Sequence, residues 1–282
     1  MNFLQIAALA LVQGIAELLP VSSSAHVIVA EKLLGLDPTT PQMTLLLVML
    51  HTGTMLAVII YFWKTWRTTY FSSAQALRAN AVLLLLATVL TALVGLTILQ
   101  LIKHTVARNS PGFEIETLFG NAKLMAAGLA AAGVLILISS RARPVGPGDL
   151  TVTRAAWIGA VQGLCLPFRG FSRSGSTIST GLIAGVSRLR AEEFSFALAV
   201  LLTPAVLFRE AQRLYAAGVT TPGVPGTDTW WSLFGPGVSG MVLSFLAGLL
   251  ALRWLSSWLE AGRWHLFGIY CLAASGAVLW LG

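Results

Sequence analysis

The sequence predicts an all-α polytopic membrane protein with an inverted-topology repeat, in which six transmembrane helices accompany two broken, re-entrant helical hairpins. Composition is the first observation behind this prediction: the 282 residues are 56% apolar and only 10% charged, whereas an average soluble domain is about 25% charged. So few charges could not cover a soluble protein of this size. The composition excludes a soluble globule, a disordered chain and a nucleic-acid-binding module, despite the net charge of +7.

Long apolar runs are the second observation. A helix needs about 20 mostly apolar residues to cross a bilayer. Six segments approach this length, namely residues 43–63, 79–102, 123–138, 194–208, 238–252 and 264–281. We therefore expect six spanning helices, with lipid contacts along their apolar faces.

Two interrupted regions, residues 4–34 and 155–187, are the third observation. Each contains two half-length apolar stretches, joined by a polar turn that includes Pro20 in the first region and Pro167 in the second. Proline cannot continue a helix past its own position without loss of a backbone hydrogen bond. We therefore predict that each region is a re-entrant hairpin of two short helices.

The two hairpins are also alike in sequence, which indicates an internal duplication. Gln13-Gly14 precedes Leu19-Pro20 in the first hairpin, as Gln162-Gly163 precedes Leu166-Pro167 in the second. We divide a single membrane domain, residues 1–282, into repeats of about 1–140 and 153–282. Three spans per repeat place the second repeat upside down, and discontinuous helices of inverted repeats build sites near the bilayer midplane.

The basic residues predict the orientation. Lys and Arg are enriched in the cytoplasmic loops of membrane proteins. If the loop at 64–78 is cytoplasmic, the inside loops hold ten Lys and Arg residues and the outside segments hold five. This asymmetry predicts that both termini lie outside.

The first hairpin carries an acidic site. Glu17 lies within a membrane-embedded segment, where ionisable residues are costly and mark function by default. Gln13 precedes it by one helical turn and shares its face. A carboxylate and an amide oxygen suit a hard divalent cation, Mg²⁺ or Ca²⁺. The alternative is that Glu17 is a hydrogen-bonding group in a polar seam between helices.

Three serines and a histidine follow Pro20. Ser22, Ser23 and Ser24 open the next half-helix, where they could serve as N-caps. His26 lies four residues after Ser22 and three after Ser23, so we expect its ring over the same helix face. A hydroxyl beside an imidazole is an activated nucleophile, and a histidine can itself attack phosphorus. The alternative for His26 is a purely structural hydrogen bond.

The second hairpin supplies an anion site. We expect Gly170 to permit an unusual turn, after which hydroxyl and guanidinium groups gather at a helix start: Ser172, Arg173, Ser174 and Thr177. Helix N-termini bind anions, and a guanidinium grips phosphate through two nitrogens. Alternatively, Arg173 pairs with Glu17 or extends to the interface. For Arg169 a phosphate role and a membrane-edge position both remain open, and for His51 we favour a structural hydrogen bond.

Together these groups indicate phosphate-ester or phosphoanhydride chemistry on a lipid. Residues 13–26 (QGIAELLPVSSSAH) and 170–177 (GFSRSGST) resemble the bacitracin-resistance family of undecaprenyl-diphosphate phosphatases, and the similarity extends over most of the chain. The resemblance implies a bacterial cytoplasmic-membrane enzyme, with its site facing the periplasm. It implies hydrolysis of undecaprenyl diphosphate to undecaprenyl phosphate, a divalent cation, a role in recycling the lipid carrier for peptidoglycan synthesis, and bacitracin resistance.

The resemblance maps a catalytic set onto Glu17, Ser23, His26 and Arg173. It leaves Ser23, His26 or water as the nucleophile. We expect Gln13 to join Glu17 in holding the cation, and we expect the polyprenyl diphosphate to contact Gln13, Ser22, Ser24, Gly170, Ser172, Ser174 and Thr177. Two positions depart from the family pattern: Ala25 replaces a frequent Gly, and Arg169 replaces the usual Pro before Gly170. The sequence leaves homodimerisation open.

Two other functions are alternatives for a membrane protein with these features. Phosphatidic-acid phosphatases carry a histidine six residues after a Ser-Arg pair, but Ser179 and Phe194 stand at that distance from Arg173 and Arg188. A flippase for polyprenyl phosphates is the alternative from another class, because inverted repeats with broken helices are also typical of transporters. A flippase would need Arg173 but no nucleophile.

Overall fold

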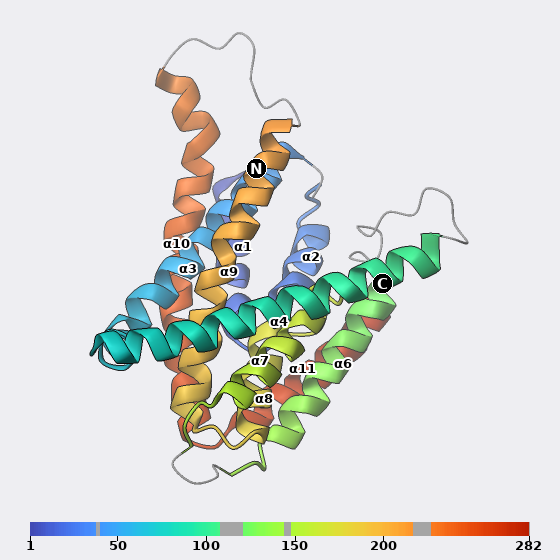
Figure 1. Ribbon diagram of the computed structural model, residues 1–282. Helices are drawn as coiled ribbons and strands as arrows, with labels where there is room; N and C mark the ends of the chain where they lie inside the picture. Colours follow the sequence, from blue (N-terminus) through green and yellow to red (C-terminus); the bar gives the residue numbers. More distant parts are fainter. Residues whose placement is uncertain (38–39, 108–120, 144–147, 217–226, 282) are drawn as a thin grey trace.

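The computed structural model is all-helical over the residues it describes, which are 1–282 without 38–39, 108–120, 144–147, 217–226 and 282 (Figure 1). The first half of the chain forms α1 (Phe3–Leu18), α2 (Ser23–Leu33), α3 (Pro41–Thr69), α4 (Ala74–Ala107) and α6 (Ala122–Ser139). The second half forms α7 (Val152–Leu164), α8 (Arg173–Ile183), α9 (Arg188–Ala216), α10 (Thr227–Glu260) and α11 (Trp264–Leu281).

Four helices are long and apolar enough to cross a bilayer: α3, α4, α6 and α10. The apolar part of α11 is shorter, and α9 begins with the charged segment 188–193. These helices confirm a polytopic membrane protein, whereas the exact set of six spans and the inverted repeat stay predictions. Most of these helices extend beyond the predicted apolar runs, because backbone hydrogen bonding continues into the flanking polar residues.

Both interrupted regions form pairs of short helices, as predicted. Helix α1 ends at Leu18 beside Pro20, and α2 begins at Ser23. Helix α7 ends at Leu164 ahead of Pro167, and α8 begins at Arg173. Within each pair the two helices pack on one another. The first turn, residues 19–22, is buried throughout, whereas the second turn buries Pro167 and Gly170 and leaves Leu166 and Arg169 exposed. Irregular backbone at membrane depth requires cover of the kind that the first turn has.

Glycines bring the hairpins close to the long helices. Helix α1 packs on α10, where a Cβ on Gly14 would lie 2.6 Å from the Ala247 Cβ. Helix α7 packs on α4, which crosses it in Figure 1, and a Cβ on Gly163 would lie 2.7 Å from the Val94 Cβ. The two Gln-Gly pairs that indicate a repeat therefore serve the same kind of close helix contact in each half.

Gly170 has a different role from the one we expected. It is not among the glycines with positive φ, so the turn needs no left-handed backbone there. Instead, a Cβ on Gly170 would overlap the Met125 carbonyl oxygen of α6 and lie 2.7 Å from the Met125 carbonyl carbon. Glycine is required at position 170 because the backbone there approaches the backbone of Met125 too closely to admit a Cβ atom.

We expect Gly170→Ala to destabilise the protein by about 1–3 kcal/mol, as overpacking of a filled interior does. Thermal unfolding of the purified protein in detergent measures this. Gly276→Ala is the matched control, because a Cβ there meets no atom within 4 Å. Equal melting temperatures for the two variants would contradict the packing role.

Candidate active site

The two hairpins meet through an ion pair. The Arg173 Nη2 atom, at the start of α8, donates to the Glu17 Oε1 atom near the end of α1 at 2.7 Å. The side chains are 24% and 17% exposed, respectively, so the pair is largely sheltered. Among the described residues, the buried Arg173 Nη1 atom has no hydrogen-bond partner. The structure thus forms the Glu17–Arg173 pair that the sequence left as an alternative, and it keeps one guanidinium nitrogen available.

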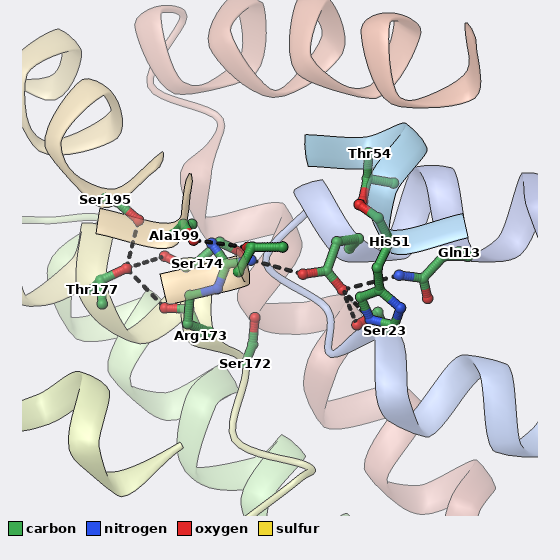
Figure 2. Close-up of polar contacts among 12 residues, drawn as sticks. Gln13, Ser23, His51, Thr54, Ser172, Arg173, Ser174, Thr177, Ser195 and Ala199 are labelled. Atoms are coloured by element: carbon green, nitrogen blue, oxygen red, sulfur yellow. Dashed lines mark hydrogen bonds and ion pairs between the residues drawn. The ribbon is translucent and has the colours of Figure 1, made fainter. Parts of the chain in front are cut away.

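Three groups surround the second carboxylate oxygen of Glu17. The Ser23 hydroxyl donates to Glu17 Oε2 at 2.6 Å, and the Gln13 amide nitrogen donates to it at 3.2 Å. The His51 Nε2 atom lies 3.7 Å from the same oxygen. Figure 2 shows Gln13, Ser23 and His51 on one side of the site and Arg173 on the other. Helices α1, α2, α3 and α8 therefore contribute to one polar cluster.

The histidines are fixed by backbone carbonyls. His26 Nδ1 lies 2.8 Å from the Ser22 carbonyl oxygen, and His51 Nδ1 lies 2.8 Å from the Leu47 carbonyl oxygen. A carbonyl only accepts, so each Nδ1 carries a proton. The His26 Nε2 atom lies 2.6 Å from the Tyr270 hydroxyl. Both nitrogens of His26 are thus engaged away from the Ser23 hydroxyl, which bonds Glu17 instead.

The turns of the two hairpins are joined by hydroxyl groups. Ser22 has φ of 66°, the sole positive φ of a non-glycine residue in the described chain, and such strain is typical of functional sites. Its hydroxyl donates to the Arg169 carbonyl oxygen at 2.8 Å, and the Ser174 hydroxyl donates to the Leu19 carbonyl oxygen at 3.2 Å. These bonds hold Arg173 in register with Glu17.

Other predicted phosphate ligands have internal partners. Ser172 caps α8 by accepting from the Gly175 amide at 3.2 Å. Thr177 is fully buried; its hydroxyl donates to the Arg173 carbonyl oxygen at 2.8 Å and lies 2.6 Å from the Ser195 hydroxyl of α9 (Figure 2). Ser24 is half-buried next to Ser23. Arg173, whose Nη1 atom has no hydrogen-bond partner among the described residues, is the charged anion donor at this junction.

The oxygen donors fit a hard cation that needs few protein ligands. In the described part of the chain, no three His, Cys, Asp or Glu side chains gather into a metal-binding group. Mg²⁺ commonly binds through one or two carboxylates together with water and substrate phosphates. Glu17 supplies the carboxylate, and half a rotation of the Gln13 amide would present its oxygen beside it. A diphosphate would complete such a site.

Two residues contact the site beyond the set that the sequence predicts. For His51 we favoured a structural hydrogen bond, and its Nδ1 lies 2.8 Å from the Leu47 carbonyl oxygen, while its Nε2 lies 3.7 Å from Glu17 Oε2. Its place inside a spanning segment was a usable signal for this second contact, since ionisable groups there are costly. Tyr270 carried no signal, because it stands in an apolar run 244 residues from His26.

This arrangement defines a polytopic membrane protein whose charged and nucleophilic side chains meet between two helical hairpins. The family model described as bacitracin resistance protein BacA matches residues 6–277. The chain is 60% identical over 281 residues to undecaprenyl-diphosphatase 2 of Acinetobacter baylyi, covering 100% of this chain and 98% of the relative. It is 33% identical over 294 residues to an undecaprenyl-diphosphatase of Desulfosudis oleivorans, covering 97% and 96%. The chain belongs to the bacitracin resistance protein BacA family.

Proposed function

We infer that this protein hydrolyses undecaprenyl diphosphate to undecaprenyl phosphate and inorganic phosphate. Its family and the names of its relatives support this activity. Recycling of the lipid carrier for peptidoglycan synthesis and resistance to bacitracin follow from the family. The observation in the structure that carries the assignment is the junction of Ser23, Glu17 and Arg173, at 2.6 and 2.7 Å. It combines a nucleophile, a base and a phosphate ligand.

We propose that Arg173 changes partner when the substrate binds. In the free protein its Nη2 atom is held by Glu17, while Nη1 is without a partner among the described residues. A diphosphate presents several charged oxygens, and a guanidinium binds two of them in its plane. Movement of Arg173 onto the phosphate would leave Glu17 with the Ser23 hydroxyl. Substrate binding would thus free Glu17 Oε1 from its ion pair while Oε2 keeps the Ser23 hydroxyl.

Chemistry then follows from the Ser23–Glu17 contact. The Ser23 oxygen attacks the terminal phosphorus, Glu17 takes the hydroxyl proton, and undecaprenyl phosphate leaves with the electron pair of the broken P–O bond. Water then attacks the phosphorus of the serine phosphate, the Ser23–phosphorus bond breaks, and the Ser23 oxygen takes back the proton from Glu17 as inorganic phosphate is released. Charge spreads over the transferred oxygens in a loose transition state, so a positioned guanidinium contributes mainly through electrostatic stabilisation.

A divalent cation would be held by Glu17 and Gln13 together with the substrate. When bound, it neutralises charge on the diphosphate. The chain's own contribution is to keep Gln13 and Glu17 one helical turn apart on the same face of α1, where their side chains lie 3.2 Å apart.

We also propose that the protein lies in the bacterial cytoplasmic membrane, with both termini and the site facing outside. The excess of Lys and Arg in the predicted inside loops supports this orientation. A cysteine placed at Asn2, in a background without Cys165 and Cys271, should react with an impermeant reagent in intact cells. If this cysteine reacts only after permeabilisation, the N-terminus lies inside and the proposed orientation is wrong.

Phosphate release tests the function directly. Purified protein in detergent, given undecaprenyl diphosphate and Mg²⁺, should release one inorganic phosphate per lipid, and the Arg173→Ala variant should not. The same protein in liposomes distinguishes the flippase alternative. Transfer of undecaprenyl phosphate between leaflets without phosphate release would replace the phosphatase assignment with a transporter.

A further inference from the structure

Tyr270 of α11 is the side chain that holds the ring of His26. The Tyr270 hydroxyl lies 2.6 Å from His26 Nε2, and the two rings stack with centroids 5.7 Å apart and an interplanar angle of 16°. Tyr270 therefore contacts the ring through both its hydroxyl and its aromatic face.

Tyr270 lies at the level of the first hairpin's turn. Its neighbour Cys271 is fully buried and lies with its thiol 3.1 Å from the Pro20 carbonyl oxygen. Tyr270 itself is 46% exposed, on a helix whose other exposed residues include Ile269 and Leu272. A hydroxyl on such an apolar surface is stabilised by a protein partner, because apolar surroundings offer no hydrogen bond. His26 is that partner.

The hydrogen bonds determine which proton each atom carries. Because the Ser22 carbonyl accepts from Nδ1, the neutral imidazole has its lone pair on Nε2. The Tyr270 hydroxyl must then be the donor to Nε2. The lone pair that a histidine nucleophile would use is occupied in this arrangement, whereas the Ser23 hydroxyl is already on a carboxylate.

We propose that Tyr270 is a positioning residue for His26, a role that rests on the proposed phosphatase function. The Tyr270 hydroxyl donates to Nε2 while the Ser22 carbonyl oxygen accepts from Nδ1, which fixes the ring as the Nδ1–H tautomer. His26 therefore supports the reaction through a ring held in one orientation, and it forms no bond to phosphorus.

Removal of one hydroxyl tests the proposal. Tyr270→Phe keeps the ring stack and should lower kcat about fivefold, the effect of one lost hydrogen bond, with KM changed less than about twofold. Tyr61→Phe is the matched control: its hydroxyl also makes one bond, to Ser256 at 3.0 Å between α3 and α10, and its kcat should stay at the parent value. A Tyr270→Phe variant with parental kcat would overturn the role.

A double variant tests whether Tyr270 acts through His26. If it does, Tyr270→Phe should cause no further loss when added to His26→Gln, because coupled residues are not additive. Independent, multiplying losses would overturn the positioning role. Melting temperatures of all variants in detergent separate a folding defect from a loss of kcat.

Nitrogen NMR gives a readout that needs no activity. The chain has four histidines, and the spectrum of ¹⁵N-histidine-labelled protein, compared with His26→Gln, identifies the His26 signals. At about pH 8, where an unperturbed imidazole is neutral, His26 should show a protonated Nδ1 and an unprotonated Nε2. Tyr270→Phe should move the Nε2 signal. An Nε2–H tautomer, or an unmoved Nε2 signal, would overturn the proposal even if phosphate release confirms the phosphatase.

Discussion

Arg173→Lys is expected to lower kcat/KM about 30- to 1,000-fold, which corresponds to about 2–4 kcal/mol of lost transition-state stabilisation. The guanidinium holds Glu17 through Nη2 and has the buried Nη1 atom for the substrate. A lysine ammonium is a point charge without this fixed plane of donors. The loss should fall mainly on kcat, because charge spreads onto the phosphoryl oxygens during transfer. Arg173→Ala should be inactive.

Phosphate release from undecaprenyl diphosphate, at fixed Mg²⁺ and detergent, measures the Arg173 variants. Arg190→Lys is the control, since Arg190 also pairs with a carboxylate, Glu193 at 3.0 Å, within α9. Its activity per folded molecule should match the parent. If kcat/KM of Arg173→Lys lies within about threefold of the parent value, a difference under 1 kcal/mol, Arg173 acts only by neutralising charge. If Arg173→Ala is active, Arg173 has no role in the reaction.

Glu17→Gln should reduce kcat by about 1,000-fold or more, the upper range for loss of a positioned base. The amide keeps the size of the side chain but cannot take the Ser23 proton or compensate the charge of Arg173, and it would offer a cation a neutral oxygen in place of a charged one. Glu17→Asp should retain a small activity that excess Mg²⁺ partly restores. Glu193→Gln, which alters a carboxylate outside the site, serves as the control in the same assay.

The Ser23–Glu17 contact also predicts how the losses in these variants combine. If the two residues act as one unit, Ser23→Ala should be nearly as inactive as Glu17→Gln, and the double variant should lose little more. Parental activity in Glu17→Gln would leave Glu17 only a structural role. High activity in Ser23→Ala would exclude serine attack and return the choice to His26 or water.

Local signals in the sequence are sufficient to predict the class of protein and the charged residues of the site. Apolar runs mark helices that need a bilayer, and Pro20 and Pro167 end the first helix of each hairpin. Both features act along the chain itself, so no tertiary contact is needed to interpret them. Glu17 and Arg173 were also identifiable, because an ionisable group in an apolar segment carries a high desolvation cost. The two motif segments that contain these residues, 13–26 and 170–177, indicated the family of the chain.

Only the tertiary structure decided which of these groups touch. Spacing along a helix shows that His26 and Ser23 share a face, but it does not show what lies opposite that face. The strained turn at Ser22 and the packing of α11 turn His26 toward Tyr270, while Ser23 reaches Glu17. Thr177 likewise faces Ser195, and Gly170 meets the backbone of Met125. Contacts between different helices, from the six positions between Glu17 and Ser23 to the 244 between His26 and Tyr270, depend on how the helices pack. A single sequence carries no local signal for that packing.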